Sequence, residues 1–148
     1  MSTIQLRAPA GADAPFSDAT PRADRSRSRS GAGGGTMLLV GATSDIGNAV
    51  AREYAAAGWN VVLAARDEAG AARNAADLAE RSGRPVGVRR LDIAETDGFA
   101  AFLDGLDWLP DTVVCAVGAL GDQREAETDP AAASLAMRVN FEGPALLL

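Results

Sequence analysis

Residues 37–47, MLLVGATSDIG, decide the fold of this chain. The apolar run from Met37 to Val40 has the character of a buried strand, and Gly41 follows it at once. After Gly47 the sequence shows an alanine-rich pattern typical of a helix. A strand, a glycine turn and a helix start place backbone N–H groups and the positive end of the helix dipole where an anion binds. The stretch therefore predicts a pyrophosphate site and, with it, a bound dinucleotide.

Strand and helix patterns alternate from residue 36 to the end of the sequence. The second and fourth strands are apolar on both faces, whereas Arg89 and Arg90 close a third strand that suits an edge. In the first helix, the apolar face is expected to begin at Ile46 and to repeat at helical spacing. Pro144 is expected to kink the last helix. The expected strands are 37–40, 60–65, 86–91 and 112–117, and the expected helices are 46–57, 68–82, 95–106 and 130 onward.

Repeats of this length imply right-handed crossovers and a parallel sheet covered by helices on both faces. The character of the strands predicts the spatial order 3-2-1-4, the first half of a doubly wound, Rossmann-type α/β fold. A ligand then binds at the C-terminal ends of strands 1 and 4. A complete fold of this type continues further, so we expect a sheet truncated after the fourth strand and its following helix. The free apolar edge of strand 4 is expected to favour aggregation.

Residues 1–35 differ in composition from residues 36–148, which we expect to form one domain. The first segment is rich in Gly, Pro, Ala, Ser, Asp and Arg, a composition that cannot bury enough apolar surface to fold. We therefore predict a disordered, low-complexity leader. Its run of alternating Arg and Ser at 25–30 has two interpretations: a contact with nucleic acid, or part of a leader translated ahead of a natural start near Met37. The second is favoured, because short basic runs often match by chance.

The charge and the rare residues exclude several classes of function. The formal net charge is −6, and because residues 1–35 carry five arginines against three aspartates, residues 36–148 carry −8. Such acidity disfavours nucleic acid and anionic membranes as partners. The single cysteine, Cys115, excludes an internal disulfide and fits a cytoplasmic protein. No metal site is expected. The sequence has no histidine and no lysine, and Tyr54 is its only tyrosine, so catalysis by His or Lys is excluded within it.

With Gly41, Ile46 and Gly47 in place, the turn resembles the Gly-x-x-x-Gly-x-Gly turn of the short-chain dehydrogenase/reductase family, and the resemblance extends over residues 37–148. Asp45 replaces the middle glycine. Aspartate tolerates left-handed backbone and caps helices, and we expect this carboxylate to face solvent, away from the pyrophosphate. Ser44 stands where the extended branch of the family has glycine, which disfavours an epimerase. The resemblance implies cofactor contacts at Gly41, Thr43, Ser44, Asp45, Ile46 and Gly47.

The resemblance also implies a preference for NADP over NAD. After the second strand, Ala65 stands where NAD-preferring members carry an acid, and Arg66 stands where NADP-preferring members carry a base. A guanidinium holds a 2′-phosphate by paired hydrogen bonds. The alternative is a solvated loop arginine paired with Asp67.

Two further segments match the family in part. Asp92 and Ile93 follow the third strand, where the family has an aspartate beside the adenine; the alternative for Asp92 is a turn or helix-start carboxylate. The fourth strand leads into Cys-Ala-Val-Gly at 115–118, where the family has Asn-Asn-Ala-Gly. Ala116 and Gly118 are therefore expected at the cofactor, Gly118 letting the backbone approach its ribose. Cys115 is expected to be a buried, inert thiol.

Asn140, in an Asn-x-x-Gly segment, matches the helix asparagine that helps to order water near the family's catalytic lysine; its alternative is a solvent-facing polar residue. The family's chemistry also needs a serine and a tyrosine followed four residues later by lysine. Tyr54 is followed by Gly58 at that spacing and cannot serve. The resemblance thus implies hydride transfer between NADP(H) and a small carbonyl or alcohol substrate by a homo-oligomeric full-length protein. The chain as printed is expected to be an inactive fragment of it.

Two alternatives stay open. One is a non-catalytic dinucleotide-binding module, favoured by Asp45, by the lost asparagines and by the missing tyrosine–lysine pair. The other is a truncated or misassigned product that does not fold alone, favoured by the Arg/Ser leader and the abrupt end.

Overall fold

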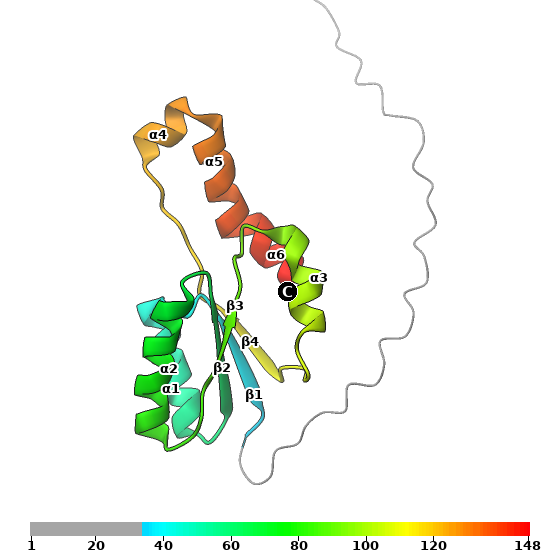
Figure 1. Cartoon of the computed structure of the whole chain (residues 1–148). Coiled ribbons are helices and arrows are strands. Elements are labelled where there is room, and N and C mark those ends of the chain that lie inside the picture. Colours follow the sequence, from blue (N-terminus) through cyan, green and yellow to red (C-terminus); the bar gives the residue numbers. More distant parts are fainter. Residues whose placement is uncertain (1–33) are drawn as a thin grey trace, which may run out of the picture.

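The computed structural model of the chain describes residues 34–148, so the predicted leader lies, apart from its last two residues, outside the described residues (Figure 1). Four strands form one parallel sheet in the order β3-β2-β1-β4, which confirms the predicted order. In register, Val40 of β1 lies beside Ala64 of β2 and Cys115 of β4, so these strands end at one edge of the sheet. The strands are β1 (Thr36–Val40), β2 (Asn60–Ala65), β3 (Gly87–Arg90) and β4 (Thr112–Cys115).

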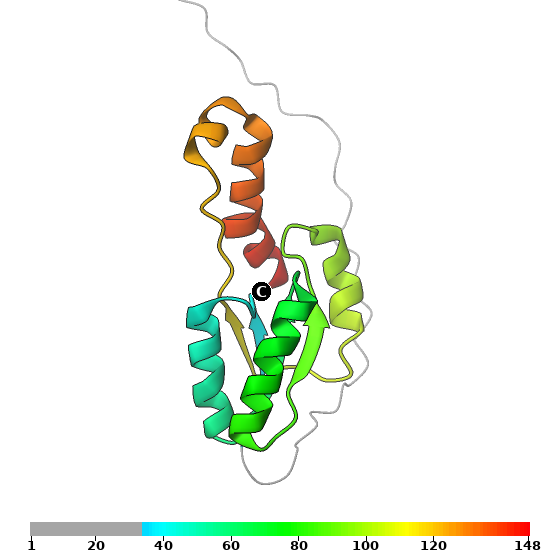
Figure 2. The ribbon, with the colours of Figure 1, turned by 60° about the vertical axis from the view of Figure 1, so that its left-hand side comes forward.

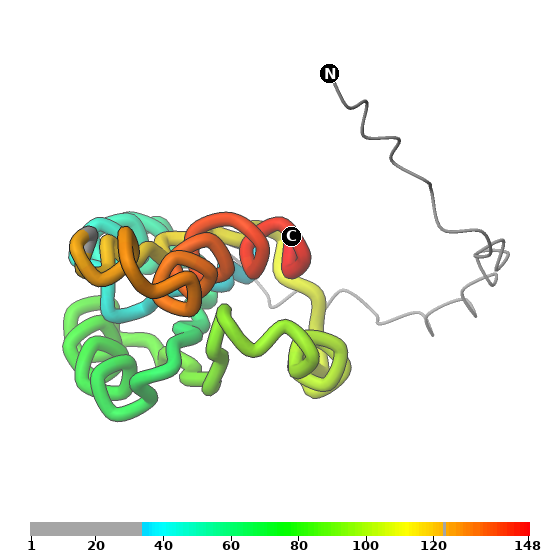
Figure 3. Tube along the Cα trace, turned by 90° about the horizontal axis from the view of Figure 1, so that it is seen from above, coloured from blue at the N-terminus to red at the C-terminus, as the bar shows by residue number. Residues whose placement is uncertain are grey.

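Helices cover both faces of the sheet, as Figures 1 and 3 show. Helices α1 (Asp45–Ala56) and α2 (Glu68–Ser82) lie on one face. The short turn η1 (Thr96–Gly98), helix α3 (Phe99–Asp104) and helix α6 (Gly143–Leu147) lie on the other. Successive side chains of a strand point to opposite faces. Accordingly, Leu39 belongs to the apolar cluster under α1 and α2, and Leu38 belongs to the cluster that holds Phe99.

The predicted inner face of α1 is wrong at its two ends, Ile46 and Ala57. The Ile46 side chain is 78% exposed, whereas Gly47, Ala51 and Ala55 are buried against the sheet. Small residues at a spacing of four let the helix backbone approach the strands closely. A Cβ on Gly47 would lie 3.0 Å from Leu39 Cδ1, which shows how little space remains. Val50 and Tyr54 are half-buried beside this face, and Ala57 is exposed.

The segment after β4 differs from the expected loop and single helix. It contains α4 (Gln123–Thr128), α5 (Pro130–Met137), the π-helical turn η2 (Arg138–Glu142) and then α6. Pro144 lies in the first turn of α6, directly after the π turn, because proline has no N–H to continue the regular ladder. Figure 2 shows α4 and α5 extending beyond the ends of the strands. None of the helices within residues 34–148 has both the length and the apolar character that crossing a membrane requires.

The third helix and the fourth strand are also shorter than predicted. Phe99 and Leu106 are buried, but the helical part divides into η1 and α3. The expectation that the fourth strand is buried on both sides is wrong, because Val113 is 37% exposed. β4 has β1 as its only partner within the described sheet, so one of its edges is open.

Gly41 and Gly83 offer a matched test of the turn after β1. Both have positive φ, 92° at Gly41 and 66° at Gly83. A Cβ at Gly41 would lie 2.7 Å from the Ala116 carbonyl, whereas at Gly83 it would meet nothing within 4 Å. We expect Gly83→Ala to lower the free energy of unfolding by about 1 kcal/mol, and Gly41→Ala to lower it by at least about 2 kcal/mol more. Urea unfolding of both variants measures this difference, and equal losses would contradict the steric argument.

Candidate functional site

A cleft of about 710 Å³ lies at the edge of the sheet where the strands end. Its floor is formed by residues at or just after the ends of the strands: Val40, Ala65, Leu91 and Ala116. The turn after β1 and the loop after β4 add walls, and Leu135 and Val139 close one side from the helical segment. This is the edge at which the predicted fold binds its ligand, between β1 and β4, where the order in which successive strands are added to the sheet reverses.

The glycine turn is held tightly against β2. The N–H groups of Gly41 and Ala42 both donate to the Ala64 carbonyl, at 2.9 and 3.1 Å. The Ser44 N–H then donates to the Gly41 carbonyl at 2.9 Å, and Ser44 Oγ accepts from the Gly47 N–H at 3.2 Å. Ser44 is therefore the N-cap of α1, a role that the sequence analysis considered for Asp45. Asp45 itself is exposed, as expected.

The structure brings most of the predicted cofactor residues to one cleft, and places the others near it. Asp45 and Ile46 are exposed outside the lining, and Gly47 is buried beneath the Ala116 side chain. The predicted residues that line the cleft are Gly41, Thr43, Ser44, Arg66, Asp92, Ile93, Ala116 and Gly118. Sequence reasoning gave no site role to Asp67, Val117, Ala119, Leu135 or Val139, which also line it.

Arg66 and Asp92 meet at the cleft. Arg66 Nε lies 3.9 Å from Asp92 Oδ2, with the arginine side chain 72% exposed and the aspartate side chain 12% exposed. Asp92 Oδ1 accepts from the Ala94 N–H at 3.0 Å, so the interpretation as a turn carboxylate holds. Asp92 also lines the cleft, and its place beside an adenine stays a prediction. An ion pair of this length with an exposed arginine is weak. The terminal amino groups of Arg66 are therefore able to turn toward an anion.

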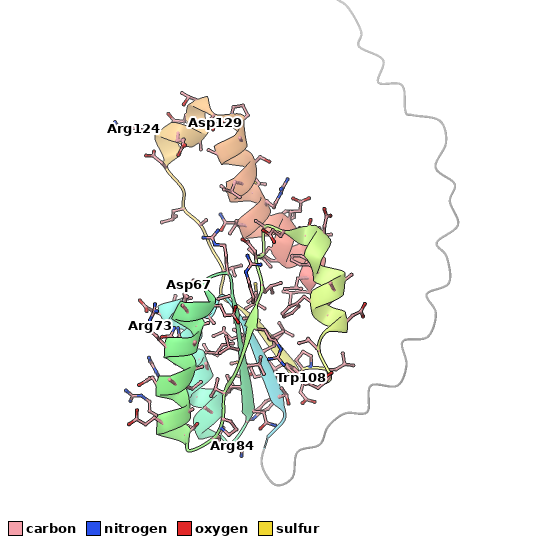
Figure 4. The ribbon with its side chains drawn as sticks, in the orientation of Figure 1. Asp67, Arg73, Arg84, Trp108, Arg124 and Asp129 are labelled. Carbon is pink, nitrogen blue, oxygen red and sulfur yellow. The ribbon has the colours of Figure 1, made fainter. Side chains whose placement is uncertain are left out.

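Asp67 does not pair with Arg66 as the alternative proposed. Its Oδ1 accepts from the Gly70 N–H at 2.9 Å and caps α2. Figure 4 shows Asp67 at the end of α2 that lies nearest the strand ends, with Arg73 further along the same helix. Arg66 is thus the arginine that the cleft contains, among the described residues.

Asn140 fastens the loop after β4 to the π turn. Its Oδ1 accepts from the Ala119 N–H at 2.8 Å, and its Nδ2 donates to the Ala119 carbonyl at 2.7 Å. The Asn140 amide thereby satisfies both the N–H and the carbonyl of the Ala119 backbone, as a neighbouring strand would. Asn140 does not line the cleft, but Ala119 does. In this structure its side chain therefore shapes a wall of the cleft.

The segment 115–118 keeps its place without the family's asparagines. The Ala116 N–H donates to the Val40 carbonyl at 2.8 Å and extends the β1–β4 pairing past the last paired residues. Cys115 is a free thiol, half-buried against the apolar cluster on the α3 side, rather than fully buried as expected. A Cβ at Gly118 would contact only Asn140 Oδ1, at 3.6 Å, so the residue has space on its cleft side.

Comparison with known proteins agrees with this geometry. Residues 41–148 match the profile of a family described as enoyl-(acyl carrier protein) reductase. No curated protein sequence matches the chain.

Several solved structures of dehydrogenases are similar to this chain. A putative short chain dehydrogenase from Escherichia coli CFT073 is 27% identical, with a TM-score of 0.63, over 76% of this chain and 52% of that one. One from Shigella flexneri 2a, complexed with NADP, is 26% identical, with a TM-score of 0.63, over 76% and 49%. The bulky-bulky ketone specific alcohol dehydrogenase of Comamonas testosteroni shares the fold, at 23% identity and a TM-score of 0.67 over 76% and 46%.

The chain thus spans about half the length of the solved relatives that it matches. The family profile covers the glycine turn, the cleft and the segment that contains Asn140. The chain belongs to the short-chain dehydrogenase/reductase family.

Proposed function

We propose that residues 36–148 form the NADP-binding half of an oxidoreductase that transfers hydride between NADP(H) and a carbonyl or alcohol substrate. The observation that carries this proposal is the cleft at the strand ends, with the glycine turn on one wall and Arg66 beside it. The relative from Shigella flexneri, which was solved with NADP, supports the choice of cofactor.

The residues present fit a dinucleotide. A Cβ at Gly41 would collide with the backbone of Ala116, so the turn keeps its backbone close to the cleft only because residue 41 is glycine. Helix α1 begins beside the cleft at Ser44, and the positive end of its dipole favours the charge of a diphosphate. The nicotinamide of the bound cofactor would supply or accept the hydride.

The adenosine end of the cofactor is assigned to the side where β2 and β3 end. Ala65 is buried there and carries no carboxylate to accept a hydrogen bond from the ribose 2′-hydroxyl of NAD. Arg66 supplies a cation for the 2′-phosphate of NADP. Asp92 Oδ1 accepts from the Ala94 N–H, and Asp92 Oδ2 lies 3.9 Å from Arg66 Nε.

The tyrosine–lysine pair that transfers the proton in this family is not present in the sequence. The sequence contains no lysine, and Tyr54 lies on α1 with its ring 4.9 Å from the Trp59 ring, edge to face. Tyr54 and Trp59 do not line the cleft, so Tyr54 is not placed to act as a general acid. We propose that the printed chain binds cofactor without turnover, and that the whole protein is a cytoplasmic homo-oligomer without nucleic-acid or membrane partners.

A second candidate is a dinucleotide-binding module without catalysis. The replacement of the family's two asparagines by Cys115 and Ala116 favours it, because the amide groups that support the active site are absent. Both candidates require dinucleotide binding. Hydride transfer by the whole protein separates them.

Substitution of Arg66 tests the choice of cofactor. We expect Arg66→Ala to weaken NADPH binding about tenfold or more and to leave NADH binding unchanged, because only NADPH carries the 2′-phosphate. Fluorescence titration of the full chain with each nucleotide measures both dissociation constants. Arg73→Ala is the matched control, because Arg73 is exposed on α2 and does not line the cleft (Figure 4). Equal losses of affinity for NADPH and NADH would show that Arg66 does not bind the 2′-phosphate.

Asp45 is expected to weaken binding of both nucleotides through its charge. Asp45→Asn should strengthen NADPH and NADH binding by roughly two- to fivefold at low salt, and this gain should shrink at 0.5 M NaCl, because ions screen an exposed carboxylate. Glu53→Gln is the control, since it removes an exposed charge on the same helix about 12 Å further along. A gain that does not depend on salt would contradict the electrostatic explanation.

A further inference from the structure

Two asparagine side chains converge on one carbonyl oxygen inside the glycine turn. Asn48 Nδ2, from α1, and Asn74 Nδ2, from α2, each donate to the Ala42 carbonyl at 2.9 Å. Asn48 Nδ2 also donates to the Ser44 carbonyl at 2.9 Å. Ala42 is fully buried. Neither asparagine lines the cleft, and no step described above uses them.

The approach of α2 to the turn depends on a glycine. Gly70 is buried, and a Cβ there would collide with the Asp67 carboxylate and would also lie 3.1 Å from Thr43 Cγ2. Without a side chain at this position, α2 packs against the turn closely enough for Asn74, one turn further along, to reach Ala42.

These hydrogen bonds fix the direction of the next N–H group. In a trans peptide the C=O and N–H bonds point in opposite directions, so the Thr43 N–H points away from the two amides that hold the Ala42 carbonyl. Thr43 lines the cleft, whereas Asn48 and Asn74 do not. Within residues 34–148, no group accepts a hydrogen bond from the Thr43 N–H. A donor is thus left available on the cleft side of the turn.

We infer that Asn48 and Asn74 are positioning residues that lock the Ala42–Thr43 peptide so that the Thr43 N–H binds an oxygen of the dinucleotide's diphosphate. This inference rests on the proposed function. The two donors occupy both lone pairs of the carbonyl. A flipped peptide would leave two half-buried amide donors facing an N–H, so that both donors would lose their hydrogen-bond acceptor. The donor is therefore oriented before the nucleotide arrives, and binding does not have to order it.

The redundancy of the two amides predicts a specific pattern in variants. Asn48→Leu and Asn74→Leu remove one donor each without adding charge, and each leaves the carbonyl with one partner. We expect each single variant to bind NADPH within about threefold of the unmodified chain, and the double variant to bind it at least about tenfold more weakly. NADH binding should fall by the same factor, so that the NADPH/NADH ratio stays unchanged. Binding of adenosine 2′-monophosphate, which has no diphosphate, should not change.

Asn60→Leu is the matched control. Asn60 starts β2, and its Oδ1 accepts from Arg84 Nη2 at 2.8 Å. Figure 4 shows Arg84 at the opposite end of the sheet from Asp67. This variant should lower the free energy of unfolding without changing the affinity for either nucleotide, and so separates lost stability from lost positioning.

A double variant that is folded and binds NADPH as the unmodified chain does would overturn the inference and leave the proposed function standing. An equal loss of affinity for adenosine 2′-monophosphate would also overturn the inference. It would show that the double variant disturbs the whole binding site and not only the donor for the diphosphate. If the unmodified chain binds neither NADPH nor NADH, the proposed function fails and the inference fails with it.

A measurement on the unmodified chain keeps the inference testable if the double variant does not fold. In a titration with NADPH followed by NMR, the amide proton of Thr43 should move downfield as it gains an anionic acceptor. Titration with adenosine 2′-monophosphate should not move it. A Thr43 amide that stays in place at saturating NADPH would overturn the inference.

Discussion

The close approach of two backbones, at Gly41 and Ala116, is the constraint on which the site depends. Gly41 combines a φ of 92° with the absence of space for a Cβ, so the chain leaves β1 by turning directly over the end of β4. The turn then bonds to the Ala64 carbonyl of β2. Three strand ends are thereby joined through backbone atoms, and α1 starts at the cleft because the turn delivers the chain there.

The elements predicted best from the sequence are those whose first and last residues are marked by capping residues. The bounds of α2 were predicted to the residue, because Asp67 caps its start and Gly83, with left-handed backbone, ends it. The inner face of α1 was missed, because small residues such as Ala51 carry little weight in a pattern of large apolar side chains. Helix α4 was missed although Asp122 caps it. The sequence analysis expected a kink at Pro144 and did not predict the π turn that precedes it.

The candidate site was predicted in outline and not in its contacts. Motif spacing placed the turn and the strand ends in one cleft, because the C-terminal ends of parallel strands share an edge. The partners of the polar side chains come from distant segments: Asp92 for Arg66, Ala119 for Asn140, and Ala42 for Asn74. Each of these contacts depends on the packing distance between elements. Residue types and spacing leave that distance open until the fold is known.

The π turn and the residue after it have a mechanical consequence for the two outer strands. Asn140 bonds to the loop that follows β4, and Gly143, three residues later, packs against the Ile93 carbonyl in the loop that follows β3. Less than one helical turn separates these two anchor points. The segment 140–143 therefore ties the loop that follows β4 to the loop that follows β3 across a fixed short length of helix. A side chain larger than hydrogen at position 143 would collide with Ile93 and push the loop after β3 away from this helical segment.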